Sequence, residues 1–188
     1  MQKFVKAFSV IFSTNISARR LGSPNFMFDL VVMDEAGQCN IVSSLIPITK
    51  ADSLLLVGDP QQLKPVIVLD DTINDQLLKI YSIPKSYDYK RKSILDVMRE
   101  RDKISQYVQL TYHYRCGKKI IDFSNKKYYN SKLHLQTIKE NGEILLLNVK
   151  NQNIKNRNSA YDESVAIVNY IKKNDLHDVA IITPFVNQ

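Results

Sequence analysis

Two adjacent carboxylates, Asp34 and Glu35, directly follow the apolar run Leu30-Val31-Val32-Met33. Four apolar residues without polar alternation are typical of a parallel strand covered on both faces. In open α/β sheets, ligands bind at the carboxyl ends of such strands. A Mg²⁺–triphosphate site needs a hard oxygen ligand for the metal and a carboxylate to orient or deprotonate the attacking water. Asp34 and Glu35 could supply both, although an Asp34 that only caps a following helix would give the same pattern.

A second polar cluster follows a second apolar run, residues 53–57, and begins at Gly58-Asp59-Pro60. Gly58 lets the backbone turn sharply at the strand end. Asp59 and Gln62 could place polar groups beside a phosphate or its water. A glutamine amide suits this task because it can donate to a phosphate oxygen and accept from water at once. Gly-Asp-Pro also occurs in ordinary turns. The functional interpretation therefore depends on its position after a second apolar run, downstream of Asp34-Glu35.

A third candidate is Arg115, which ends the stretch Tyr112-His113-Tyr114-Arg115 before an expected helix. A guanidinium at a domain edge can reach a γ-phosphate and stabilise charge that develops in phosphoryl transfer. The alternative is a solvated or salt-bridged arginine at a helix start.

The elements that must position these residues follow an α/β pattern. The two apolar runs, joined by a short crossover, predict neighbouring strands of a parallel sheet. The character of the chain changes between residues 104 and 110, so we place a domain boundary there. We expect helices at 72–80, 93–101, 116–130 and from about 159, an exposed loop at 81–92, and further strands at 7–12, 143–149 and 178–183.

Composition indicates a globular protein with a basic second half. The 188 residues are 44% hydrophobic and 24% charged, with a formal net charge of +7. Residues 1–104 carry 14 basic and 12 acidic side chains, hence +2, whereas residues 105–188 carry 12 and 7, hence +5. Such an excess suits a phosphate-tracking surface, although a generic lysine-rich surface would look the same.

The cysteine, histidine and hydropathy patterns argue against several classes of protein, namely disulfide-linked, zinc-binding and membrane-spanning proteins. Cys39 and Cys116 form no CxxC or metal-ligand spacing, which favours a reducing compartment. The three histidines are scattered and lack zinc-site spacing. No apolar run approaches the roughly 18–20 residues of a membrane span, and no signal peptide is evident, so we expect a cytoplasmic protein without a membrane partner.

Taken together, the motifs resemble superfamily 1 helicases, most closely the subgroup typified by the nonsense-mediated-decay helicase. Four stretches occur in the family's order: Asp34-Glu35-Ala36-Gly37-Gln38, Gly58-Asp59-Pro60-Gln61-Gln62-Leu63-Lys64-Pro65, Tyr114-Arg115 with Phe123-Ser124-Asn125 and Tyr128-Tyr129, and Ile182-Thr183-Pro184-Phe185-Val186-Asn187-Gln188. Ser93-Ile94-Leu95 also resembles a short helix before the domain boundary of this family. The resemblance implies RecA-like P-loop NTPase folds, with residues 1–106 the C-terminal part of a first RecA-like domain and 107–188 the N-terminal part of a second.

The resemblance also implies roles for individual residues, with ATP and Mg²⁺ as cofactors. Asp34 matches the Mg²⁺-binding aspartate and Glu35 the catalytic glutamate. Gln62 matches the γ-phosphate-sensing glutamine, and Arg115 the arginine that the second domain supplies to the transition state. The remaining implied contacts are to nucleotide, at Gln38, Gly58 and Asp59, and to nucleic acid, at Thr183 and Pro184. Ala160 departs from the family pattern, which has an asparagine there.

The sequence contains no G-x-x-x-x-G-K-[ST] phosphate loop. We therefore expect a central fragment of an ATP-dependent helicase that acts on single-stranded or duplex DNA or RNA and needs the rest of the helicase chain. The isolated fragment should bind ATP weakly and hydrolyse almost none. The alternative is a non-catalytic nucleic-acid-binding or interaction module from a split or decayed helicase gene.

Overall fold

The computed structural model describes residues 5, 7–23, 25–138, 143–152 and 159–183. It is a mixed α/β structure with short parallel sheets, and it divides the chain into two compact units, 1–109 and 110–188. The assignment of these units to parts of two RecA-like domains, 1–106 and 107–188, stays a prediction. Within the described ranges, no helix combines the length and the apolar character that a bilayer span requires.

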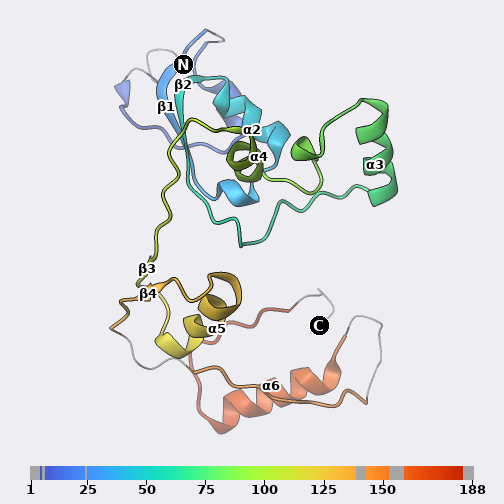
Figure 1. The fold of residues 1–188 in the computed structure, drawn as a ribbon. Helices are drawn as coiled ribbons and strands as arrows, with labels where there is room; N and C mark the ends of the chain where they lie inside the picture. Colours follow the sequence, from blue (N-terminus) through green and yellow to red (C-terminus); the bar gives the residue numbers. More distant parts are fainter. Residues whose placement is uncertain (1–4, 6, 24, 139–142, 153–158, 184–188) are drawn as a thin grey trace. The chain divides into compact units, whose positions relative to one another are not determined.

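The first unit is built on a parallel strand pair, as predicted. Strands β1 (Phe28–Met33) and β2 (Ala51–Leu56) pair with Val31 opposite Leu54 and Met33 opposite Leu56. The crossover between them consists of the 3₁₀ turn η2 (Ala36–Gln38) and helix α2 (Ile41–Ile48). In Figure 1 this helix lies beside the strand pair. The short crossover brings the carboxyl ends of both strands to one edge.

Only one face of the strand pair is covered in the described part of the chain. Met33 and Ala36 pack with Ile94 and Leu95 in a buried cluster on that face. On the opposite face, Leu30 is 50% exposed and Val32 55% exposed. Alternate side chains of a strand point to opposite sides, so Leu30 and Val32 lie on the face away from the buried cluster. Their exposure shows that the expectation of cover on both faces is wrong for the described residues.

Two further helices follow at the predicted positions. Helix α3 (Asp71–Ile80) begins after Asp70, whose carboxylate accepts hydrogen bonds from the amides of Thr72 and Ile73. Helix α4 (Ile94–Arg101) begins with a capping box, in which Ser93 and Asp96 each bond the other's backbone amide. Such caps satisfy the free amides of the first helical turn, which explains why both helices begin where they do.

The loop between α3 and α4 is only partly exposed, which corrects the prediction for residues 81–92. Asp88 is 4% exposed and accepts a hydrogen bond from Asn74 on α3, with 3.1 Å between Nδ2 and Oδ1. Arg91 reaches Asp88 at 2.8 Å and also pairs with Asp71 and Asp75 on α3. Polar and charged side chains thus attach α3 to this loop. The attachment joins residues far apart in sequence, which is why local patterns did not indicate it.

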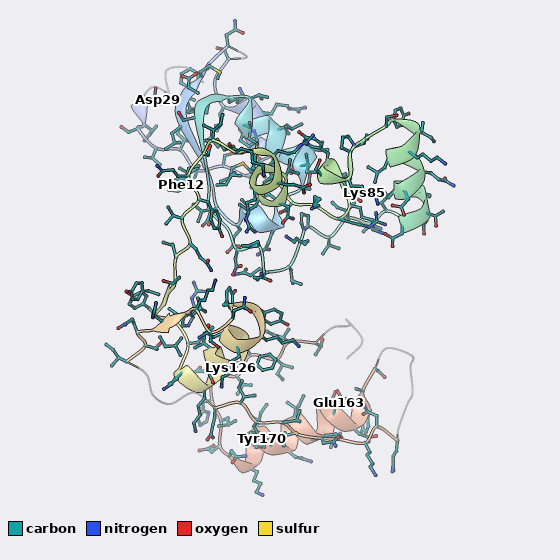
Figure 2. The ribbon with its side chains drawn as sticks, viewed as in Figure 1. Phe12, Asp29, Lys85, Lys126, Glu163 and Tyr170 are labelled. Atoms are coloured by element: carbon teal, nitrogen blue, oxygen red, sulfur yellow. The ribbon has the colours of Figure 1, made fainter. Side chains whose placement is uncertain are left out.

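Three predicted strands are absent from the structure. Residues 7–12, 143–149 and 178–183 have no strand conformation. Among the described residues, strand ladders join β1 to β2 and the two short strands of the second unit. A strand persists only beside a partner. Phe12, labelled in Figure 2, is accordingly 93% exposed.

The second unit contains two helices and a minimal parallel ladder. Helices α5 (Lys118–Tyr128) and α6 (Tyr161–Lys173) occur where helices were predicted. Strands β3 (Tyr112–His113) and β4 (His134–Leu135) pair over two residues each. Buried Asn125 joins α5 to β4, because its amide donates to the Leu133 carbonyl at 3.2 Å and accepts from the Leu133 amide at 3.0 Å. Residues 145–149 lie against α6, which carries Glu163 in Figure 2.

The Asp88 network predicts a pH-dependent contribution to stability. Burial opposes ionisation of Asp88, but hydrogen bonds from Arg91 and Asn74 outweigh it and hold the pKa below its ordinary 3.8. Asp88→Ala should lower the free energy of unfolding by about 2 kcal/mol at neutral pH, because it removes the acceptor of the buried Asn74 amide and one acceptor of the Arg91 guanidinium. Since the folded pKa is depressed, this difference should persist above 3.8 and vanish as pH falls through the folded value.

Urea unfolding of wild type and variant across this pH range measures the effect. Asp75→Ala, which removes an exposed partner of the same Arg91, is the matched control and should change stability little. A deficit for Asp88→Ala that stayed constant at all pH values would contradict the linkage.

Candidate nucleotide site

The turn after β1 presents two carboxylates and an amide to solvent. We call residues 34–38 the carboxylate turn. Glu35 has a left-handed backbone, with φ 51° and ψ 37°, and its amide donates to Asp34 Oδ1 at 2.8 Å. Gln38 Nε2 donates to Glu35 Oε2 at 3.1 Å. Helix α2 is capped by Asn40, not by Asp34, so the capping alternative does not describe this turn.

The turn after β2 orients a second amide. We call residues 58–62 the glutamine turn. Asp59 Oδ1 accepts from the amide of Gln61 at 2.9 Å, and Asp59 Oδ2 accepts from Gln62 Nε2 at 3.4 Å. Asp59 is half-buried, whereas Gln62 is exposed. A short acidic side chain that bonds its own downstream backbone is a common way to fix a turn.

The two turns touch through their backbones. The amide of Ala36 donates to the carbonyl of Val57 at 2.8 Å. A Cβ added at Gly37 would lie 2.7 Å from the carbonyl oxygen of Asp59, and one added at Gly58 would lie 2.8 Å from the amide nitrogen of Gly37. Distances this short leave no room for a side chain at either glycine. The structure thus brings the carboxylate turn and the glutamine turn together at the carboxyl ends of adjacent parallel strands.

Helix α4 supports this contact from the buried side. The amide of Ile94 donates to the carbonyl of Cys39 at 3.0 Å, directly after the carboxylate turn. Leu95 Cδ2 would lie 3.3 Å from a Cβ at Gly58. Sequence reasoning noted Ser93-Ile94-Leu95 but assigned it no position in the site. The capping pattern of Ser93 and Asp96 was the available signal for the start of this helix.

Arg115 and Thr183 belong to the second unit. Arg115 is exposed and lies between β3 and α5, and its neighbour Cys116 donates its amide to His113 Nε2 at 2.8 Å. Tyr112 and Tyr114 stack with ring centres 6.5 Å apart. Thr183 is exposed, and Pro184 lies outside the described residues. The described geometry of the candidate site is therefore that of the carboxylate and glutamine turns alone.

The sequence is similar to helicases. A model described as an AAA domain matches residues 1–69, which contain both turns. An uncharacterized ATP-dependent helicase of Methanocaldococcus jannaschii is 31% identical over 159 residues, which are 82% of this chain and 20% of that protein. The DNA replication ATP-dependent helicase/nuclease of Xenopus laevis is 30% identical over 64% of this chain and 10% of its own length. Probable helicase senataxin of Mus musculus is 30% identical over 63% of this chain and 4% of its own length.

These matches place both turns in a region that is similar to the AAA domain of ATP-dependent helicases. The chain is similar to superfamily 1 helicases. It spans a fifth or less of the length of each relative described above.

The contact between the turns predicts a specific sensitivity at Gly58. Gly58→Ala should lower the free energy of unfolding by about 1–3 kcal/mol, because the added methyl group would collide with backbone atoms that have no room to move. Gln61→Ala is the matched control in the same turn: its side chain is exposed, and its bond to Asp59 uses the backbone amide. Urea denaturation measures both, and a Gly58→Ala variant as stable as Gln61→Ala would contradict the close approach.

Proposed function

We propose that this chain supplies the metal-binding and water-activating part of an ATP site in a superfamily 1 helicase, in which ATP hydrolysis drives translocation on nucleic acid and its unwinding. The observation that carries the proposal is the backbone contact between the carboxylate turn and the glutamine turn at the ends of β1 and β2. Matches to senataxin and to the yeast helicase Sen1 support the nonsense-mediated-decay-like subgroup.

The donor set of the carboxylate turn fits Mg²⁺. Carboxylate oxygens are the hard ligands that this ion prefers. Asp34 uses Oδ1 to accept from the amide of Glu35, and among the described residues Oδ2 has no hydrogen-bond partner. Asp34 would therefore hold the ion through Oδ2. When bound with ATP, Mg²⁺ would neutralise charge on the phosphates.

Glu35 is oriented to act as the general base. Its Oε2 is held by Gln38, while Oε1 makes no hydrogen bond within the described part of the chain. Oε1 would accept a proton from the attacking water. The left-handed backbone at Glu35 and the bond from Gln38 restrict where this oxygen can point. Gln38 therefore acts by holding the base.

Gln62 is suited to sense the terminal phosphate. Its Nε2 donates to Asp59, which leaves Oε1 directed by the same bond as an acceptor for water or for a donor beside the phosphate. Gly58 keeps this turn in contact with the carboxylate turn. Asp59 would thus position Gln62 for the nucleotide.

Residues of the second unit are also proposed to take part in catalysis and in nucleic-acid binding. We propose that the two units are parts of tandem RecA-like domains and that Arg115 stabilises transition-state charge. The basic excess of residues 105–188 would favour a polyanionic strand, with Thr183 and Pro184 as candidate contacts. The unpaired cysteines Cys39 and Cys116 suit a reducing, cytoplasmic environment.

The role of Glu35 is tested in the complete protein that carries this chain. Glu35→Gln should lower the ATP turnover number by about 10² or more, because it removes the general base while keeping the hydrogen bond to Gln38. A fluorescent ATP analogue should bind the variant as it binds wild type. Glu100→Gln, which alters an exposed acid on α4, is the control and should hydrolyse ATP normally. Turnover by Glu35→Gln within a few-fold of wild type would refute the assignment.

The nucleic-acid role is tested by a salt titration of binding to single-stranded DNA and RNA. The logarithm of the association constant should fall with the logarithm of salt concentration, with a slope of about −0.7 per phosphate contact. Binding that did not depend on salt would contradict a phosphate-tracking surface. Salt-dependent binding by a complete protein that hydrolyses no ATP would favour the non-catalytic module instead.

A further inference from the structure

The chain just beyond Gln62 has little apolar packing to hold it. Leu63 is 82% exposed, Val66 is 89% exposed and Val68 is fully exposed. The described residues 57–70, between β2 and α3, form no helix or strand. Because apolar burial is the main source of tertiary stability, this side of the glutamine turn needs another anchor.

Lys64 supplies that anchor through an ion pair with α4. Its Nζ lies 2.5 Å from Asp96 Oδ1, and the side chains are 37% and 15% exposed, respectively. The other oxygen, Asp96 Oδ2, accepts from the amide of Ser93 at 2.9 Å and from its hydroxyl at 2.8 Å. Ser93 is fully buried. The carboxylate is thus fixed before it meets the lysine, so little side-chain entropy is lost on its side of the pair.

The same helical turn holds the carboxylate turn. Ile94, next to Ser93, donates its amide to the Cys39 carbonyl at 3.0 Å. Ile94 and Leu95 are buried against Met33 and Ala36. Residues 93–96 therefore contact two segments of the candidate site. They meet the carboxylate turn and Cys39 through backbone and apolar contacts, and they meet the chain after the glutamine turn through the Lys64–Asp96 pair.

We propose that Lys64 and Asp96 are positioning residues that fix Gln62 relative to Asp34 and Glu35. The inference rests on the proposed ATPase function and deepens it. Neither residue is among those proposed to contact nucleotide. Loss of the pair should therefore slow the chemical step through misplacement of Gln62 while nucleotide affinity stays unchanged.

The test uses steady-state ATP hydrolysis by the complete protein. Lys64→Met should lower kcat about tenfold and leave KM for ATP within about twofold of wild type. Lys64→Arg, which keeps the positive charge, should retain most of the wild-type kcat. Lys92→Met is the matched control, because Lys92 also pairs with an acid of α4, Glu100, at 3.0 Å and is 35% exposed. It should leave kcat unchanged.

A second measurement needs no turnover. In the 188-residue chain, Lys64→Met should speed hydrogen exchange at the amides of Gln61 and Gln62 several-fold, and Lys92→Met should not. Unchanged exchange, an unchanged kcat, or equal losses in both variants would overturn the positioning role. A wild-type complete protein that hydrolyses no ATP would instead contradict the proposed function, and the exchange rates would still decide whether Lys64 anchors the glutamine turn.

Discussion

The close backbone approach at Gly37 and Gly58 is the constraint on which the first unit depends. Parallel pairing of β1 and β2 brings their carboxyl ends to one edge, but pairing alone leaves room for side chains between the turns that follow. The two glycines remove that room and let amide and carbonyl groups meet directly. The polar residues beside them are therefore positioned by backbone atoms, which are far less free to move than side chains.

The small hydrophobic core and the candidate site share the same elements. Met33 ends β1, Ala36 lies inside the carboxylate turn, and both pack against α4. Leu95 of that helix also lies beside Gly58. Because interiors are closely packed, a volume change in this cluster would shift the turns as well as lower stability. Stability and site geometry cannot be tuned separately in this unit.

Local signals in the sequence predicted the elements, and long-range contacts decided the rest. The apolar runs before Asp34 and Gly58 correctly indicated paired parallel strands, and the helices expected at 72–80 and 93–101 occur as α3 and α4. The strands predicted at 143–149 and 178–183 failed because a strand depends on a partner that its own residues do not specify. The polar residues at the strand ends were found from sequence, and their roles stay predictions. Neither the glycine contact nor the Asp96 anchor could be found this way, because each joins segments that are distant in the chain.

At Glu35, the left-handed backbone lowers stability, whereas the carboxylate at the same position serves the proposed chemistry. A non-glycine residue in this conformation is held at a cost of roughly 1 kcal/mol or more, which glycine would avoid. Laboratory selection for thermal stability alone would thus favour loss of the carboxylate at residue 35. A lineage that keeps glutamate there is retaining a residue that the fold itself does not prefer.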